Sequence, residues 1–359
     1  MFRTDFKKAL YLLHLWLGLC SGLVVFILGI TGSLYSFSDE LKDVFYHDRL
    51  YVDVPADAKP KSFDELLYVA QAKLGSKKKI SRVEIQTAPN RTYMFRSLKS
   101  GLYFEKVYVN PYTAQVVFHE DANREFFNVV LSLHRTLLLG DKVGHFIIRW
   151  SVVCFVFLLL SGIVLWWPAK WKAKLLKAKF KVKWAAKKKR LNYDLHQVFG
   201  FYAFIVLLII ALTGLMWSFD MVAEKKTKLT SDTTGTMLAA SNNQILSKVN
   251  ALNSSAAYYL YNIPAAKSGT INVSTYLDAD QIHQRIQYRF DRYSGKLLLQ
   301  GKAFEKLNLT DQIKSLNYDL HTGTVIGIWG KILAFIAGLI AASLPVTGFL
   351  MWLWRKKNK

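Results

Sequence analysis

The chain of 359 residues is short of cysteine, of acidic residues and of soluble-enzyme motifs, and each shortage excludes a class of protein. Two isolated cysteines cannot build a disulfide scaffold, and without CxxC or CxxCH the chain has no thioredoxin-like, zinc-ribbon or covalent c-type haem site. No GxGxxG, P-loop or GxSxG motif occurs. Disorder is excluded as well, because 52% of the residues are apolar and 14% are aromatic.

The sequence contains four long runs without charged residues. Residues 9–38, 150–169, 195–219 and 332–354 contain no Asp, Glu, Lys or Arg. A spanning helix needs about 20 apolar residues. The runs predict four transmembrane helices, at residues 12–37, 146–167, 196–218 and 327–353. Pro345 predicts a kink in the fourth. The first run is too long for a cleaved signal peptide and has no small-x-small cleavage site, so we expect a retained anchor.

The charge is divided unevenly along the chain, with 48 basic against 25 acidic residues and a net charge of +23. Ten lysines and one arginine crowd residues 170–190 without any acid, and the two termini are basic too. The positive-inside rule then places this segment and both termini in the cytoplasm, and both long loops outside. The lysines orient the chain and contact anionic lipid, or dock an acidic cytoplasmic partner. Nucleic-acid binding is excluded, because the cations lie in three short segments.

The membrane segments form an internal repeat. His14, Gly18, Thr31, Gly32, Ser36 and Phe37 recur at a constant offset of 182 as His196, Gly200, Thr213, Gly214, Ser218 and Phe219. His134 recurs as His321, and Ser161-Gly162 recurs as Thr347-Gly348. Each copy has an even number of spans, so we expect parallel repeats about a pseudo-twofold axis along the membrane normal. Sites would form between the halves.

The two long loops are also similar to each other. VYVNPYTAQVV (107–117) matches YRFDRYSGKLL (288–298), and each predicts a strand, a tight turn and a second strand. An amphipathic stretch precedes each hairpin: residues 62–74 begin with a capping box at Ser62, and in residues 241–252 Asn242 or Asn243 could cap. Each loop is therefore expected to form a small module of a helix and an antiparallel sheet.

The predicted fold is an α-helical integral membrane protein with α+β extracytoplasmic modules. Its segments are a cytoplasmic head and first helix (1–38), a first outer module (39–143), a second helix (144–168), a Lys-rich cytoplasmic loop (169–195), a third helix (196–219), a second outer module (220–326), and a fourth helix with a basic tail (327–359).

Four of the eight histidines occupy repeat-equivalent positions. His14 and His196 lie at the cytoplasmic ends of their helices, and His134 and His321 lie at the outer face. Polar residues in a membrane are costly and usually functional. A single such histidine is more often only hydrogen-bonded, but a pair facing the axis can clamp one group, and bis-histidine ligation of haem iron suits this geometry. The sequence thus predicts non-covalent haem whose iron is ligated by these four residues, with one pair at each membrane face.

Other residues near the pairs receive different predictions. His145 stands eleven residues after His134 and could pair with it, although Gly140 and Gly144 are expected to break that helix. We expect His145, Arg149 and Lys331 to meet haem propionates or an anionic substrate rather than iron. Glycines four residues after His14 and His196 suit close approach of a macrocycle or helix packing, and the (Ser/Thr)-Gly pairs are assigned to packing. His47, His119 and His283 are expected on the solvated surface.

Several motifs together resemble the PepSY-associated transmembrane family (PepSY_TM). They are LHRTLLLG (133–140), LSGIVLWW (160–167), LTGLMW (212–217), LHTGTVIG (320–327) and VTGFLMWLWRKK (346–357), with VNPYTAQVV and FDRYSGKLL resembling paired PepSY domains. The resemblance extends to inner-membrane ferric-siderophore reductases of the FoxB type. It implies a four-span bacterial inner-membrane protein with two b-type haems, ligated here by His14, His134, His196 and His321, which reduces a ferric siderophore at the periplasmic face. His145 departs from the arginine expected there.

Three functions remain open at this point, and no catalytic residue is assigned. In a reductase, electrons would come from a separate flavoprotein or from quinol, because the cytoplasmic segments are too short for a nucleotide-binding domain. A siderophore or solute permease without redox chemistry would suit duplicated halves. A membrane anchor whose outer modules bind other proteins would need none of the histidines.

Overall fold

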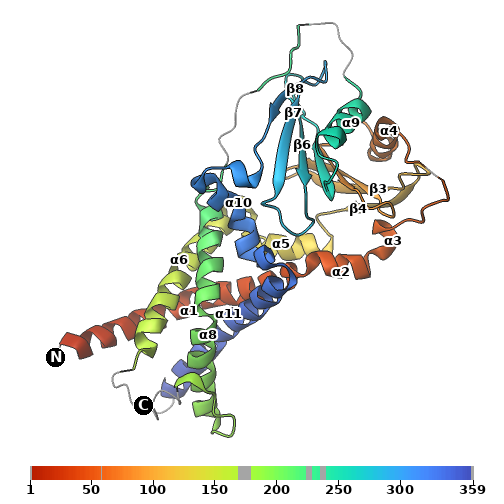
Figure 1. Cartoon of the computed structure of the whole chain (residues 1–359). Coiled ribbons are helices and arrows are strands. Elements are labelled where there is room, and N and C mark those ends of the chain that lie inside the picture. The colour runs from red at the N-terminus through yellow and green to blue at the C-terminus, as the bar shows by residue number, and fades with distance from the viewer. Residues whose placement is uncertain (1, 58, 169–178, 224–228, 235–239, 357–359) are drawn as a thin grey trace. The chain divides into compact units, whose positions relative to one another are not determined.

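The structure, a computed structural model, describes residues 2–57, 59–168, 179–223, 229–234 and 240–356. These residues form two compact units (Figure 1). The helical unit comprises residues 1–38, 129–223 and 317–359, and the sheet unit comprises residues 39–128 and 224–316. Much of the predicted Lys-rich loop (169–178) and the end of the basic tail (357–359) lie outside the described residues.

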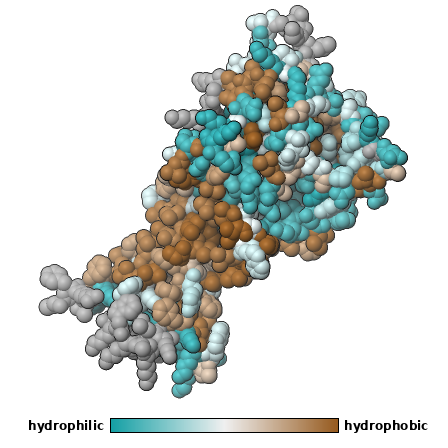
Figure 2. Space-filling view, viewed as in Figure 1, coloured by the Kyte–Doolittle hydropathy of each residue, from teal (hydrophilic) through white to brown (hydrophobic). Residues whose placement is uncertain are grey.

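Four long helices build the helical unit: α1 (Phe2–Ser36), α6 (Gly140–Trp166), α8 (Lys188–Ser218) and α11 (Gly327–Lys356). Within the described ranges, four helices are long and apolar enough to cross a membrane, as predicted. Hydrophobic side chains cover their outer surface (Figure 2), as expected where the surrounding solvent is lipid rather than water. Pro345 lies inside α11, and the predicted kink stays a prediction.

The long helices pack in a ring. α1 contacts α6 and α11, and α8 contacts the same two helices, so α1 and α8 stand diagonally opposite. Small residues bring the backbones close: a Cβ added at Gly29 would lie 2.6 Å from the Gly338 carbonyl oxygen of α11. Apolar contact among Leu159, Leu207 and Ala341 fills another part of the ring. Small-residue packing of this kind is typical of membrane helices.

Two short helices lead into two of the long ones. α5 (Phe126–Thr136) precedes α6, and α10 (Leu309–Thr322) with the 3-10 turn η2 (Thr324–Ile326) precedes α11. The chain turns at left-handed residues, among them Leu137 (φ 51°), Leu138 (φ 58°) and Gly323 (φ 85°), a conformation that is costly for leucine. The predicted break therefore lies before Gly140. It was wrong for Gly144, which lies within α6 against the Thr136 carbonyl.

Eight antiparallel strands form one sheet in the sheet unit. They are β1 (Arg82–Gln86), β2 (Tyr93–Lys99), β3 (Tyr103–Val109), β4 (Val116–Asp121), β5 (Tyr258–Asn262), β6 (Ile271–Tyr276), β7 (Arg285–Phe290) and β8 (Leu297–Gln300). The order is β4-β3-β2-β1-β5-β6-β7-β8. Each long loop supplies four strands, and the hairpin predicted in each is β3–β4 or β7–β8. The sequence did not predict that β1 pairs with β5, which joins the two halves into a continuous sheet.

Helices α4 (Phe63–Leu74) and α9 (Asn242–Leu252) lie beside each other on one face of this sheet (Figure 1). The core between helices and sheet consists of buried apolar side chains from both halves, including Phe63, Leu66, Ile245, Val249, Val83, Phe95 and Tyr261. Ser62 caps α4 by accepting a hydrogen bond from the Glu65 amide at 3.2 Å, as predicted. The prediction of Asn242 or Asn243 as the cap of α9 was wrong, because Ser241 is the cap.

The predicted hairpin turns use the same chemistry in both halves. Asn110 Oδ1 accepts from the Tyr112 amide at 2.8 Å, and Asp291 Oδ1 accepts from the Tyr293 amide at 2.9 Å. Such side-chain bonds two residues ahead define Asx turns. The remaining short helices of the sheet unit are α2 (Ser38–Phe45), α3 (His47–Leu50) and the 3-10 turn η1 (Phe304–Lys306).

Candidate functional site

The structure brings the four repeat-equivalent histidines together in two pairs. His14 on α1 and His196 on α8 have ring centroids 6.5 Å apart at an interplanar angle of 79°. His134 on α5 and His321 on α10 have ring centroids 6.2 Å apart at 69°. His134 thus lies against His321, which answers the pairing that the sequence left open.

The two pairs lie at opposite ends of the helical unit. His14 stands near the beginning of α1, and Thr31, which contacts His134, stands near its end. The 17 residues between them span about 25 Å of helix. α8 repeats this arrangement with His196 and Thr213, the residue that contacts His321. The unit therefore carries one pair of imidazoles toward each membrane face.

In the first pair, a hydroxyl-glycine dipeptide of a neighbouring helix holds each histidine. His14 Nδ1 lies 2.8 Å from Ser161 Oγ on α6, and His196 Nδ1 lies 2.8 Å from Thr347 Oγ1 on α11. The glycine after each hydroxyl faces the same ring: a Cβ added at Gly162 or at Gly348 would lie 3.5 Å from the nearest Cε1. Each glycine thus leaves room for the imidazole that the hydroxyl of the preceding residue binds.

The second pair repeats these contacts with different helices. His134 Nδ1 lies 3.0 Å from Thr31 Oγ1 on α1, and His321 Nδ1 lies 3.0 Å from Thr213 Oγ1 on α8. The following glycines are closer here, since an added Cβ would lie 3.0 Å from His134 Cε1 and 3.3 Å from His321 Cε1. All four (Ser/Thr)-Gly pairs therefore position histidines, and the packing predicted for them includes contact with imidazole rings of neighbouring helices.

The hydrogen bonds define which ring nitrogen carries the proton. Each hydroxyl donates its own hydrogen to a backbone carbonyl of its helix, as Thr347 Oγ1 does to Ser343 at 2.9 Å and Ser161 Oγ does to Leu158 at 3.2 Å. The hydroxyl oxygen then accepts from Nδ1–H. His321 Nδ1 also lies 3.0 Å from the Ile210 carbonyl, which can only accept. The imidazoles are thus held as Nδ1–H tautomers, with the lone pair of Nε2 available as a ligand.

A repeated hexapeptide supplies two of the histidines and escaped the sequence analysis. LNYDLH occurs at 191–196 and again at 316–321. Its asparagine binds the residue that holds the histidine: Asn192 Nδ2 donates to the Thr347 carbonyl at 2.9 Å, and Asn317 Nδ2 donates to the Thr213 carbonyl at 3.2 Å. Both of its aspartates are fully buried. Each copy thus clamps its partner threonine twice, and the recurrence of an identical hexapeptide was the signal that could have revealed it.

Each of the three residues assigned to anionic groups contacts a side chain of the helical unit. His145 Nε2 lies 3.8 Å from Asp141 Oδ1, one turn earlier in α6. The Arg149 guanidinium stacks over Phe219 at 4.8 Å, and the Lys331 ammonium lies 5.9 Å from the centre of Phe37. Phe37 and Phe219 are themselves repeat-equivalent, so the geometry matches Lys331 with Arg149 rather than with His145.

Two of the loop histidines, His47 and His119, are exposed, as predicted, and His283 is half-buried. His119 Nε2 lies 3.0 Å from Glu105 Oε2, His47 stacks on Tyr51 at 4.4 Å, and His283 meets Phe304 edge to face at 4.8 Å. Across the described ranges, no three of the His, Cys, Asp and Glu side chains gather as a metal site.

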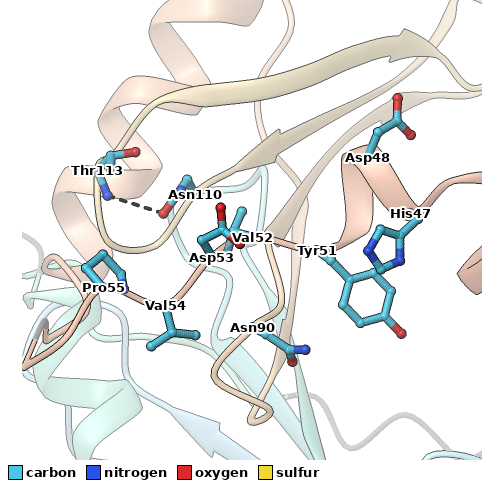
Figure 3. Close-up of a pocket in the computed structure, with 10 residues that line it drawn as sticks. All are labelled: His47, Asp48, Tyr51, Val52, Asp53, Val54, Pro55, Asn90, Asn110 and Thr113. Atoms are coloured by element: carbon cyan, nitrogen blue, oxygen red, sulfur yellow. Dashed lines mark hydrogen bonds between the residues drawn. The ribbon is translucent and has the colours of Figure 1, made fainter.

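A separate cavity of about 740 Å³ lies within the sheet unit, beside α3 and the chain that follows it. Its lining includes His47, Asp48, Tyr51, Asp53 and Asn110 (Figure 3). The rings of His47 and Tyr51 stack on each other at one end of the cavity. Burial raises the pKa of the Tyr51 phenol. The cavity is wide and open to solvent, and it contains none of the four paired histidines.

Fold and site together define a multi-pass membrane protein whose four long helices hold a histidine pair at each end. The sequence profile of the PepSY-associated TM region matches residues 11–355, essentially the whole chain. The chain belongs to this family. A comparison with curated proteins gives no match.

Proposed function

We propose that the chain is a haem-containing oxidoreductase of the bacterial inner membrane that passes electrons to a ferric siderophore on the outer side. One observation carries the proposal: two imidazole pairs stand at opposite ends of a membrane bundle, and each imidazole presents Nε2 while Nδ1 is held from behind.

The spacing of the rings fits a shared metal. Bonds from a metal to an imidazole nitrogen are about 2 Å long, and the ring centre lies roughly 1 Å behind that nitrogen. Two imidazoles in line on one metal therefore have centres roughly 6 Å apart, close to the observed 6.5 Å and 6.2 Å. Neutral imidazoles from two different helices are the donor set of b-type haem proteins.

The surrounding residues have the roles that such a site needs. Ser161, Thr347, Thr31 and Thr213 fix the tautomer and orientation of the histidines, as hydrogen-bond partners behind metal ligands generally do. Arg149 and Lys331, which lie over the repeat-equivalent rings of Phe219 and Phe37 in the helical unit, are assigned to the propionates. Bound haem would supply a one-electron couple whose potential depends on these ligands and on their hydrogen bonds.

The charge distribution supports the direction of transfer. The positive-inside rule places His14 and His196 on the cytoplasmic side, beside the Lys-rich segment, and His134 and His321 on the periplasmic side. Electrons would enter from a separate flavoprotein or from quinol, because the chain has no nucleotide-binding motif of its own. Ferrous iron binds siderophores poorly, so reduction at the periplasmic side would release iron for uptake.

A reduced-minus-oxidised visible spectrum of the detergent-purified full chain, with a pyridine haemochrome count, tests the proposal. We expect two b-type haems per chain, and one-electron reduction by dithionite. One haem would mean that only one pair ligates. A haem-free protein, purified after haem supplementation during expression, would overturn the proposal.

The acceptor requires a second assay. The chain would be reconstituted into vesicles that enclose a reductant, with a ferric siderophore outside and a ferrous-specific chelator beside it. We expect ferrous iron to appear only with haem-loaded protein. Siderophore entry without any reductant would favour a permease instead.

A further inference from the structure

The sheet face opposite α4 and α9 carries a row of basic and amide side chains across six consecutive strands. The strand register aligns Lys106, Arg96, Arg82, Asn262, Asn272 and Arg289, in this order from β3 through β2, β1, β5 and β6 to β7. Side chains alternate between faces along a strand. The adjacent residues Val83, Phe95 and Val273 belong to the core under the helices, so the row lies on the other face.

This row places like charges directly opposite each other, which weakens a sheet. Arg82 is paired with Arg96, and Arg96 is paired with Lys106. The row continues on β4 with Glu120, but this carboxylate already accepts from Arg49 at 2.5 Å and lies 3.8 Å from the Lys106 ammonium. Because Glu120 is bound to Arg49 and lies beside Lys106, the row has no other carboxylate to neutralise the Arg82–Arg96 pair.

Nearby charges outside the row do not remove the excess. Glu84, one row along on β1, interacts with Arg82 and Arg96, and Asp39 and Lys42 of α2 approach Glu84. Burial, and then the Arg82 charge, lowers the pKa of Arg96. The Glu84 charge acts in the opposite direction, and an anion bound beside the guanidinium would add to it.

Two polar atoms of the row are buried without a partner. Among the described residues, neither Arg96 Nε nor Asn272 Oδ1 has a hydrogen bond. Buried polar atoms of this kind are uncommon in folded proteins. Arg82 Nε, by contrast, donates to Asn262 Oδ1 at 2.7 Å. The vacant hydrogen-bonding capacity thus lies on both sides of the Arg82–Asn262 pair.

The spacing defines the chemistry that the row would recognise. Neighbouring strands lie about 4.8 Å apart, so Arg82 and Arg96 form one close pair, and Arg289 stands three strands from Arg82, about 14 Å away. Guanidinium groups bind carboxylates in a bidentate manner. Between them, Asn272 Oδ1 can accept from a hydroxyl group. Asn262 already accepts from Arg82 and donates to the carbonyls of Leu260 and Asn272, so it holds Arg82 in place rather than the ligand.

We propose that this row is a binding site for a small hydroxylated polycarboxylate anion, held by Arg82, Arg96 and Arg289 with Asn272 between them. The binding site stands on the sheet alone. Its further assignment as the docking site of the ferric substrate, which would then be an anionic chelate with carboxylate ligands, rests on the proposed function.

Titration calorimetry of the full detergent-purified chain with iron-free citrate tests the site, with acetate and inorganic phosphate at equal ionic strength beside it. We expect saturable citrate binding, weaker phosphate binding and no saturable acetate binding. Arg82→Gln should raise the citrate Kd at least about tenfold, the effect of losing a charged contact. The control Arg124→Gln removes the same charge from a side chain that is 89% exposed and lies off the row, and should leave the Kd unchanged.

Absence of saturable citrate binding, or an equal loss in both variants, would overturn the site. Phosphate binding tighter than citrate binding would overturn the polycarboxylate class. Arg96→Gln guards against a folding artefact. It relieves a like-charge pair, so the Tm of the ligand-free protein should not fall, whereas the rise in Tm caused by citrate should be lost. A lower ligand-free Tm with the citrate response intact would assign Arg96 a structural role instead and overturn its place in the site.

The same samples separate this inference from the proposed function. Citrate binding by a haem-free chain would leave the site standing and overturn the reductase. A chain with two haems that does not bind citrate would support the reductase and overturn the binding site. In the vesicle assay, Arg82→Gln should raise the KM for ferric citrate and leave the KM for a ferric hydroxamate complex unchanged. An equal change for both would overturn the docking assignment.

Discussion

The two histidine pairs make the same contacts, but they differ in what holds the helices that carry them. His14 and His196 stand inside α1 and α8, where further helical turns on both sides fix the backbone. His134 and His321 stand in the last turns of α5 and α10, just before the chain reverses through left-handed residues. The first pair therefore depends mainly on its side-chain partners, and the second depends on its turns and on close glycine contacts as well.

Removing one imidazole is the largest perturbation of either pair. His196→Ala and His321→Ala should each reduce the haem content from two per chain to one, because the remaining histidine of the pair would be the one imidazole left to hold haem there. Transfer across the membrane should be lost in both variants. Pyridine haemochrome counts and the vesicle assay measure the two effects. The control is His283→Ala in the sheet unit, which should keep both haems. Full haem content in either membrane variant would contradict the ligand assignment.

Adding a methyl group beside a histidine should separate the two pairs. A Cβ at Gly32 would lie 3.0 Å from His134 Cε1, well inside carbon–carbon contact distance, whereas a Cβ at Gly162 would lie 3.5 Å from His14 Cε1. Gly32→Ala should therefore displace the ring of the second pair, at a cost of about 1–3 kcal/mol, and lower the haem content. Gly162→Ala should be close to neutral. Thermal melting and haem counts compare the variants, and equal behaviour would show that the second pair is not more tightly packed.

Removing the hydroxyl that contacts a histidine should weaken haem binding more in the first pair than in the second. Within the described residues, Ser161 is the hydrogen-bond partner that the structure gives His14 Nδ1, while His321 Nδ1 keeps the Ile210 carbonyl when Thr213 is altered. Ser161→Ala should weaken haem binding by about 10- to 100-fold, the usual effect of losing a partner behind a metal ligand. Thr213→Val should weaken it less.

Haem titration of the apo-protein measures both affinities. Ser343→Ala provides the control, because this hydroxyl binds only the carbonyl of Ile340 in its own helix. A greater loss in Thr213→Val than in Ser161→Ala would mean that the Ile210 carbonyl does not support His321.

Much of the helical unit could be predicted from the sequence, because its signals are local or strictly periodic. Uncharged runs of membrane length defined four helices, and the internal repeat identified the four histidines that the structure pairs. The same offsets marked the (Ser/Thr)-Gly dipeptides, but offsets do not show which helix faces which. Ser161 was therefore assigned to packing, although it holds His14 from a neighbouring helix.

The sheet unit was less predictable, because its decisive contacts join residues far apart in the chain. The hairpins were visible as local turn chemistry, but β1 pairs with β5 across more than 170 residues. Only that pairing aligns Arg82 with Asn262 and so creates the basic row. The cap of α9 was misassigned for a related reason: Asp64 of α4 accepts from the Asn242 side chain at 2.7 Å, which occupies the asparagine with another helix.

The start of α5 offers the smallest and most specific test, since this helix carries His134. Glu125 accepts from the amides of Phe127 and Asn128, both at 2.9 Å, and from the Tyr46 hydroxyl at 2.8 Å. Burial, followed by the hydrogen bond to Glu125, raises the pKa of Tyr46 to about 12. α10 has no tyrosine in this role among the described residues, because Asn308 Oδ1 accepts from the Asp311 amide there.

The folded chain holds the Tyr46 proton more tightly than the unfolded chain, whose tyrosines titrate near pH 10. The proton of Tyr46 therefore stabilises the fold fully below about pH 10, and this stabilisation disappears as the pH rises through about 12. Tyr46→Phe should slightly lower the Tm at neutral pH and make its alkaline decline shallower between those values. Melting curves of the full chain from pH 8 to pH 12 measure both effects, with Tyr68→Phe, at a side chain 75% exposed, as the control. An unchanged alkaline decline in Tyr46→Phe would show that the cap of α5 does not depend on this proton, and the second pair would then rely on its turns and glycines alone.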